Sequence, residues 1–116
     1  MAIKKKKKEK KITKVYLKRL EKRALNKKDK EWAIAIKERD KVCILCGRDV
    51  FLHTHHIIPR EIKECRHVLD NGVLLCAKHH KFSRNISPHK SPFIFYNKLW
   101  EMRPEQLSRL LSIYSK

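Results

Sequence analysis

The chain has 116 residues, of which 41% are hydrophobic and 8% aromatic, so it is expected to form one small domain with a modest core. Its 30 Lys and Arg against 12 Asp and Glu give a formal net charge of +18, which favours a polyanionic partner. No apolar run approaches the length of a membrane span, which excludes a transmembrane role.

The positive charge is concentrated near the N-terminus. The first 30 residues contain 15 of the basic side chains but only 3 of the acidic ones. A lysine run of this density releases counterions on meeting phosphates, so it predicts a flexible arm that binds nucleic acid without reading its sequence. A solubilising tail and an arm for anionic membranes are the alternatives, the second disfavoured because no large apolar face or lipidation signal accompanies the lysines. The predicted contacts are Lys4, Lys5, Lys6, Lys7, Lys8, Lys10 and Lys11.

The same segment has no secretory signal, because MAIKKKKKEKK runs directly into charge without an apolar core. We therefore expect a cytoplasmic protein, in which the four cysteines stay reduced and are more suited to binding metal than to forming disulfides. A bound metal would add the stability that so small a core lacks.

Two helices are predicted before residue 41. Apolar residues at spacings near three and four over residues 13–25 indicate a basic helix with a narrow apolar stripe. The polar stretch NKKDK breaks this pattern, and a second helix then ends near Asp40. The side chains that this second helix is expected to present to a core are Trp32, Ile34 and Ile36.

Two short strands are predicted in the middle of the chain. Residues 50–58 have the β-branched and aromatic content of a strand, which Pro59 ends. Residues 73–75 form a second, buried strand after the turn signal DNG. Before the first strand, Gly47 permits the tight turn of a Cys-x-x-Cys knuckle.

The rest of the chain is predicted to be helical. Residues 76–84 are compatible with a helix, and a Pro- and Ser-containing connector precedes two short helices over residues 93–102 and 104–116. Pro104 is suited to the first turn of the last helix. The side chains expected to pack here are Phe93, Phe95, Leu99, Trp100, Leu107, Leu110, Leu111 and Tyr114.

The cysteines have the spacing of zinc ligands. Cys43-x-x-Cys46 is followed by Cys76-x-x-His79, and two such knuckles close a tetrahedron around one ion. A site without an open position is structural, and its binding energy stabilises the fold. Cys65 is the substitute ligand if His79 is not used, so a four-cysteine site is an alternative; ordinary buried thiols are the other interpretation.

Six histidines lie outside this zinc pattern. His55 and His56 are adjacent at the end of a predicted strand, so one can face an ion while the other points toward a substrate. His80 follows the second knuckle, on a helix expected to pack against that strand. The others are interpreted as ordinary surface or core residues: His53, His67 and His89.

The stretches CILCG, HHIIP, DNGVLLC and HHK, in this order and at these gaps, resemble the HNH endonuclease family in its zinc-stapled branch. The resemblance covers about residues 40–84. It implies a small α+β fold with a ββα-metal core and a structural zinc site, flanked by N-terminal basic helices and C-terminal helices. The expected segments are a basic nucleic-acid-binding arm and helix over 1–30, the zinc-stapled core over 31–88 and a C-terminal helical segment over 89–116.

The resemblance also implies roles for single residues. His56, directly before IIP, is the general base, and His55 and His80 are ligands of the catalytic ion. Asn71 matches the central asparagine, which holds the loop between the strands and orients the base. His79 stands where the family commonly has a cysteine, which is a departure from its pattern.

Hydrolysis of a phosphodiester needs a base for the attacking water and a cation to neutralise charge in the transition state. The candidate residues meet both requirements, and together with the resemblance they predict a DNA endonuclease of a phage or mobile element. The expected ions are a structural Zn²⁺ and one catalytic Mg²⁺, Mn²⁺, Ni²⁺ or Zn²⁺. Arg84 stands where a further ligand is often found and cannot bind a cation. Arg84, Arg60 and Lys81 are expected to contact phosphates instead.

Two other functions fit parts of the sequence. A noncatalytic zinc module that binds DNA or RNA needs the knuckles and the basic arm, and a ribosome-associated protein needs only the lysine run. Neither requires the set of paired histidines and asparagine. A double-strand cut would need two sites, so a homodimer or a protein partner is a further possibility, and no membrane partner is expected.

Overall fold

The computed structural model describes residues 2–115, and the side chains of residues 13–115. The chain divides into two compact units, Met1–Glu31 and Trp32–Lys116. Among the described residues, no helix is long and apolar enough to cross a membrane. The predicted contacts of Lys4, Lys5, Lys6, Lys7, Lys8, Lys10 and Lys11 lie outside the described side chains.

The first element is one continuous helix, α1 (Ala2–Asp40), so the predicted break at NKKDK is wrong. The segment contains no Gly or Pro and is rich in Lys, Glu, Ala and Leu, which are strong helix formers. The backbone of the lysine run belongs to this helix too, where a flexible arm was expected. The apolar residues predicted as a stripe along it are exposed, among them Val15, Leu17 and Leu20.

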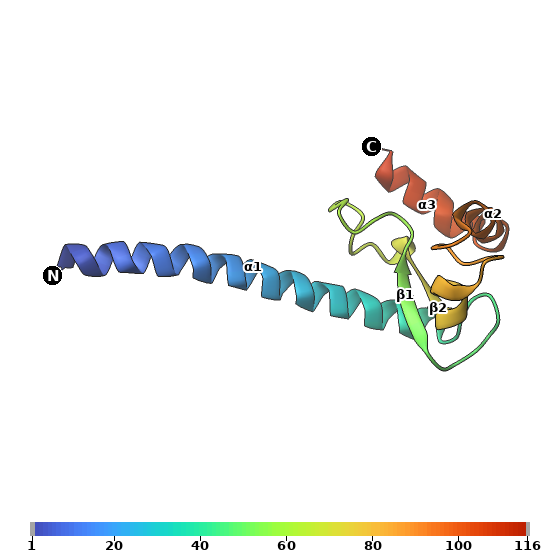
Figure 1. The fold of residues 1–116 in the computed structure, drawn as a ribbon. Coiled ribbons are helices and arrows are strands. Elements are labelled where there is room, and N and C mark those ends of the chain that lie inside the picture. The colour runs from blue at the N-terminus through green and yellow to red at the C-terminus, as the bar shows by residue number, and fades with distance from the viewer. Residues whose placement is uncertain (1, 116) are drawn as a thin grey trace. The chain divides into compact units, whose positions relative to one another are not determined.

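The unit from Trp32 onward is a small α+β fold, as predicted (Figure 1). Strands β1 (Leu52–His56) and β2 (Gly72–Cys76) pair antiparallel, with His56 opposite Gly72 and Leu52 opposite Cys76. Three-residue helix η1 (Leu69–Asn71) leads into β2, and the short helix η2 (Lys78–Phe82) follows it. The C-terminal helices α2 (Pro92–Met102) and α3 (Pro104–Tyr114) begin with proline in the first turn.

The core has two parts. One forms between β2 and the C-terminal helices, around Val73, Leu75, Phe95 and Leu99. The other joins Trp32 and Ile36 of α1 to Leu74, which lies between Val73 and Leu75 on β2. Because residues alternate along a strand, the two faces of β2 serve the two clusters and all five of its residues are buried.

Several residues predicted to pack are exposed. Ile34 is exposed because the helical turn that points Trp32 and Ile36 inward turns the residue between them outward. On α2 and α3 the buried face consists of Phe95 and Leu99 with Leu107 and Leu110, and their flanking apolar residues lie at its margin. The predicted packing residues found exposed are Phe93, Trp100, Leu111 and Tyr114.

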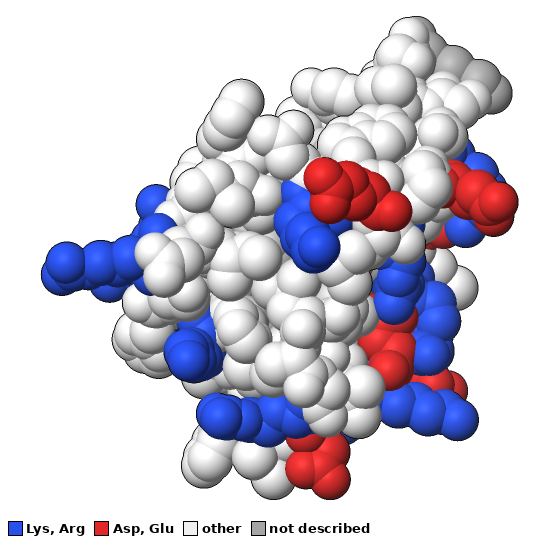
Figure 2. Space-filling model, turned by 90° about the vertical axis from the view of Figure 1, so that its right-hand side faces the viewer, with Lys and Arg blue, Asp and Glu red and all other residues white. Residues whose placement is uncertain are grey.

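Charge is distributed differently in the two units. Residues 1–31 hold half of the basic side chains of the chain. The face in Figure 2 is mostly uncharged, with Lys and Arg interspersed with Asp and Glu. The strong positive charge is therefore a property of the N-terminal part of α1.

Candidate active site

The four predicted zinc ligands lie together. The ligand atoms of Cys43, Cys46, Cys76 and His79 are all within 4.8 Å of one another. Sγ of Cys43 is 3.7 Å and Sγ of Cys76 is 3.3 Å from Nδ1 of His79, and the Sγ atoms of Cys46 and Cys76 are 3.7 Å apart. Ligands in a tetrahedral zinc site lie about 3.4 to 3.8 Å apart, so this group could hold a metal ion.

The backbone builds the first knuckle as the sequence predicts. Gly47 has φ +76°, a left-handed conformation that glycine adopts without strain, and its N–H donates to the carbonyl of Cys43 at 2.8 Å. Burial raises the pKa of Cys43, whereas hydrogen bonding from the Arg48 backbone lowers the pKa of Cys46. Burial, followed by the charge of Lys78, lowers the pKa of His79 and so favours the neutral imidazole that a metal requires.

Cys65 is not part of this group among the described residues. It is fully buried, and its carbonyl oxygen accepts a hydrogen bond from the Asn71 side chain at 2.9 Å. The group that the structure brings together therefore contains His79, the residue that departs from the family pattern, and not the alternative cysteine.

A second group consists of three histidines, His55, His80 and His89. Nε2 of His80 is 3.2 Å from Nδ1 of His55 and 3.0 Å from Nε2 of His89. A ring nitrogen carries either one hydrogen or one lone pair, so Nε2 of His80 cannot make a normal hydrogen bond to both neighbours. Three lone pairs that converge on one cation satisfy all three rings, and zinc-bound nitrogens would lie about 3.3 to 3.4 Å apart.

The protonation of these rings also fits a cation. Burial, with the neighbouring histidines and Lys81 adding to it, lowers the pKa of His80 to about 4. Burial and the same histidine cluster lower the pKa of His55 to about 3. Both rings are neutral near pH 7, which leaves each with a lone pair to donate. The three imidazoles therefore form a group of neutral nitrogen donors that suits a divalent metal ion.

Tyr96 of α2 contacts the His55 ring and orients it. Its Oη lies 2.9 Å from Nε2 of His55 and 3.5 Å from the carbonyl oxygen of Ile57. Burial raises the pKa of Tyr96 to about 12, so the phenol keeps its hydrogen. When Tyr96 donates to Ile57 it accepts from Nε2–H of His55, and the lone pair of His55 is then on Nδ1, facing His80.

Two contacts hold the ring of His56. Its Nε2 is 3.0 Å from the carbonyl oxygen of Arg66, and its ring is stacked on Trp32. A carbonyl oxygen only accepts, so this contact places the hydrogen on Nε2 and the lone pair on Nδ1. His56 therefore has the tautomer in which Nδ1 is the basic atom.

Asn71 holds the segment that connects the strands. It is fully buried, its Oδ1 accepts from the N–H of Ile58 at 2.6 Å, and its Nδ2 donates to the carbonyls of Ile58 and Cys65 at 3.0 and 2.9 Å. These three bonds fix the chain directly after His56. Asn71 thus holds the loop between the strands, and its role in orienting the base stays a prediction.

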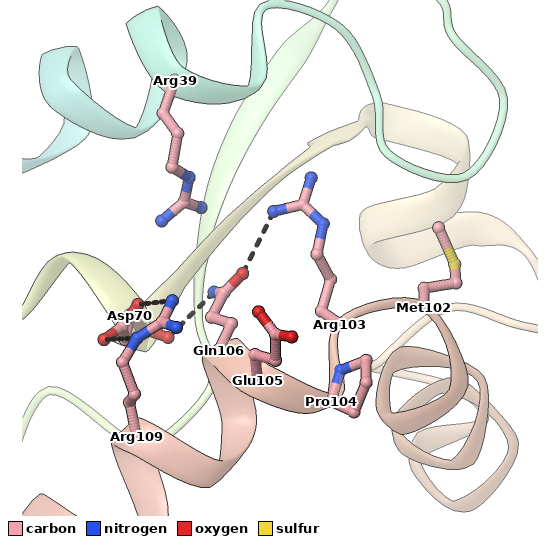
Figure 3. Close-up of a pocket in the computed structure, with 8 residues that line it drawn as sticks. All are labelled: Arg39, Asp70, Met102, Arg103, Pro104, Glu105, Gln106 and Arg109. Carbon is pink, nitrogen blue, oxygen red and sulfur yellow. Dashed lines mark hydrogen bonds and ion pairs between the residues drawn. The ribbon is translucent and has the colours of Figure 1, made fainter.

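Side chains from α1 and α3 hold the η1 turn that carries Asn71 (Figure 3). Arg109 forms two contacts of 3.0 Å with the Asp70 carboxylate. Gln106 donates to the carbonyls on either side of Asn71 at 2.9 and 3.0 Å, and Arg39 donates to two carbonyls of the same turn at 2.8 and 2.6 Å. These residues line a cleft of about 370 Å³, which we interpret as a structural junction because its polar groups bind one another.

A cavity of about 500 Å³ joins the base and the three histidines. Arg60 and Lys81 are in its wall, where they can contact an anionic substrate. Arg84 is exposed and is not part of the cavity wall, and its predicted phosphate contact stays a prediction. The lining residues are Thr54, His55, His56, Pro59, Arg60, His80, Lys81 and His89.

Three residues of this region were not predicted to belong to it. His89 was interpreted as an ordinary histidine, Tyr96 was not singled out, and Trp32 was assigned only to the core. One signal was present for His89: it sits between Pro88 and Pro92, in a connector short enough to hold it near the preceding helix.

The paired strands, the following helical turn and the two Cys/His groups together define a ββα-metal core. The family model described as HNH endonuclease matches residues 43–83, less than half of the chain, and confirms the resemblance over that segment. This match indicates a nuclease or another nucleic-acid-related function. Neither the curated proteins nor the solved structures compared with the chain contain a match.

Proposed function

We propose that the protein is a metal-dependent DNA endonuclease in which His56 is the general base. The observation that supports this function best is the cavity in which His56 lies beside three converging imidazoles. A module that only binds nucleic acid has no need of a base next to a metal-binding group. Phosphodiester hydrolysis needs both.

His56 would take the proton of the attacking water at Nδ1. The carbonyl of Arg66 accepts from Nε2–H and so favours one tautomer of the ring, in which Nδ1 is the basic nitrogen. After proton transfer, the same carbonyl stabilises the imidazolium through its hydrogen bond to Nε2. Asn71 keeps the backbone after His56 in place through its bonds to Ile58.

His55, His80 and His89 would hold the catalytic ion. When bound, a divalent cation would neutralise charge on the phosphate and stabilise the leaving oxygen. Three imidazoles without a carboxylate suit transition metals such as Zn²⁺ and Ni²⁺ better than Mg²⁺, which prefers oxygen ligands. Cys43, Cys46, Cys76 and His79 would hold the structural ion, for which Zn²⁺ fits a Cys₃His set.

The substrate would be held through its phosphates. Arg60 and Lys81 lie in the wall of the cavity, and the basic part of α1 supplies the remaining charge. Contacts of this kind position the nucleic acid and do not select a base sequence. We therefore propose weak intrinsic specificity in a cytoplasmic enzyme of a phage or mobile element, which gains its target from a partner or a second copy.

Plasmid cleavage tests this function. The protein is treated with a weak chelator that spares a Cys₃His site, and Mg²⁺, Mn²⁺, Ni²⁺ or Zn²⁺ is then restored separately. We expect nicking or linearisation with the transition metals, and a loss of about 10²- to 10⁴-fold in His56→Ala, the usual contribution of a general base. His67→Ala is the control, because His67 is a histidine that belongs neither to the cavity wall nor to the two groups of candidate metal ligands.

Two results would contradict the proposal. Plasmid that is retarded in a gel but uncut with every ion would make the protein a noncatalytic nucleic-acid-binding module. Equal cleavage by wild type and His56→Ala would show that the base lies elsewhere. Far-UV circular dichroism of each sample excludes unfolding as the cause of lost activity.

A further inference from the structure

Trp32 makes a close aromatic contact with the proposed base, although it lies on α1, outside the segment that matches the HNH family. The ring centroids of Trp32 and His56 are 3.9 Å apart and their planes differ by 9°. Trp32 is only 4% exposed, so its position is fixed by packing. The two rings are therefore stacked face to face in a buried environment.

The space for this indole comes from a missing side chain. Gly72 lies directly opposite His56 in the sheet. A Cβ at Gly72 would overlap the indole of Trp32 and would come within 2.8 Å of Cδ1 of Ile36. The backbone of Gly72 has an extended φ of −141°, so this position needs a glycine for the close approach of α1 and not for a turn.

Both rings are also tied to the same connecting segment. Nε1 of Trp32 donates to the carbonyl of Val68 at 2.9 Å, and Nε2 of His56 lies 3.0 Å from the carbonyl of Arg66. The imidazole is thus held on one face by the indole and at one edge by a carbonyl. A ring flip of His56 would lose the edge contact and move Nδ1 away from its present direction.

We propose that Trp32 is a positioning residue for His56, which sets the plane of the imidazole so that Nδ1 faces the substrate. This inference rests on the proposed function, because it assumes that His56 is the base. Trp32 does not touch the reacting atoms; it acts through the ring that it covers. The part of α1 that carries it is then required for the orientation of the catalytic base as well as for the core.

The stacking itself can be measured without catalysis. Ring protons that lie over an indole face are shifted upfield in NMR spectra by its ring current. We expect upfield-shifted His56 ring protons in the wild type, assigned by their absence in His56→Gln. Trp32→Leu should return them to ordinary positions, while Trp32→Phe should keep part of the shift. Unshifted His56 ring protons in the wild type would overturn the proposal whether or not any variant folds.

Kinetics then separate positioning from a general loss of stability. In steady-state cleavage, we expect Trp32→Leu to lower kcat by about 10- to 100-fold with little change in KM, as misplacement of a catalytic group does. Trp32→Phe should restore most of the rate. Ile36→Ala is the matched control, since Ile36 packs in the same cluster and over the same glycine but has no ring to stack on His56.

The outcomes distinguish the inference from the function on which it rests. Unchanged kcat in a folded Trp32→Leu variant, or an equal fall in Ile36→Ala, would overturn the positioning role and leave the nuclease intact. Failure of the wild type to cut DNA with any of the ions would overturn the nuclease function, and with it the base that Trp32 would position. A selective fall in kcat that Trp32→Phe reverses would support both.

Discussion

Three imidazole nitrogens converge from three different parts of the chain, β1, η2 and the connector before α2. Two of them lie in the segment that matches the HNH family, and the third, His89, lies beyond it. Arg84, at the position where the family often has a further ligand, cannot fill that role. His89, five residues further along the chain, places a ring nitrogen within 4.8 Å of those of His55 and His80.

We expect His89→Ala to weaken binding at the three-histidine site by at least about tenfold, since even outer-shell partners of metal-bound histidines contribute 10- to 100-fold. Co²⁺ titration measures this, because thiolate-to-cobalt absorption reports the Cys₃His group separately from the nitrogen site. Arg84→Ala and His67→Ala are the controls and should bind as the wild type does. Unaltered Co²⁺ affinity in His89→Ala would remove it from the ligand set.

Sequence reasoning located the residues of this site that have a local signature. Cys43 and Cys46 are recognisable from their spacing, and His55 and His56 from their place before Ile-Ile-Pro. His89 and Trp32 have no such signature, because their roles depend on how the connector and α1 return to the sheet. Contacts of that kind are set by tertiary packing, which spacing along the chain does not encode.

At the scale of elements, α1, β2 and the Arg103 link between α2 and α3 meet around one carboxylate. The Asp40 side chain is 1% exposed and accepts hydrogen bonds from Arg39 at 2.8 Å, from Arg103 at 3.2 Å and from the Leu74 N–H at 3.0 Å. Burial alone would raise the pKa of Asp40, but the hydrogen bond and charge of Arg39, together with Arg103 and Leu74, lower it overall. The ionised form therefore stabilises the folded state.

This linkage gives a pH dependence with a definite sign. The folded pKa is below the unfolded value of about 3.9, so the stabilisation is complete above that pH and is lost as the pH falls through the lower, folded pKa. We expect Asp40→Asn to lower the free energy of unfolding by about 2 kcal/mol at pH 7, and the difference from wild type to shrink below about pH 4. Urea unfolding at several pH values measures it.

Asp49→Asn is the control for this measurement, since Asp49 is an exposed carboxylate. It should follow the wild type at every pH. A difference between wild type and Asp40→Asn that stays constant from pH 7 to pH 3 would show that the ionised carboxylate is not what joins the three elements.

The elements themselves were largely predictable, and the exceptions have physical causes. Both strands follow from β-branched and aromatic content, Pro59 and the DNG turn signal, and the C-terminal helices follow from proline positions and apolar spacing. The continuity of α1 was missed because Asn26 and Asp29 are turn formers, yet their cost in a helix is small beside that of Gly or Pro. The role of Gly72 was interpreted as a turn signal, and only the approach of α1 shows why a side chain is excluded there.

At the scale of the whole molecule, most of the positive charge and the proposed chemistry belong to different segments of the sequence. The basic side chains of residues 13–31 are exposed, whereas the cavity wall contributes only Arg60 and Lys81. Binding that depends on many phosphate contacts falls steeply with salt, while proton transfer at one histidine does not. Affinity and cleavage should therefore respond to different substitutions.

Replacing Lys14, Lys18 and Lys22 with glutamine removes three exposed charges and keeps good helix formers in α1. If all three contact phosphates, the slope of log affinity against log salt concentration should become less steep by about 2.7, at roughly 0.9 per contact on duplex DNA. The single-turnover rate at saturating protein should stay the same. His56→Ala, the matched comparison, should keep the wild-type slope and lose the rate. An unchanged slope in the triple variant would exclude this stretch of α1 from the nucleic-acid interface, because a purely solubilising helix makes no contribution to counterion release.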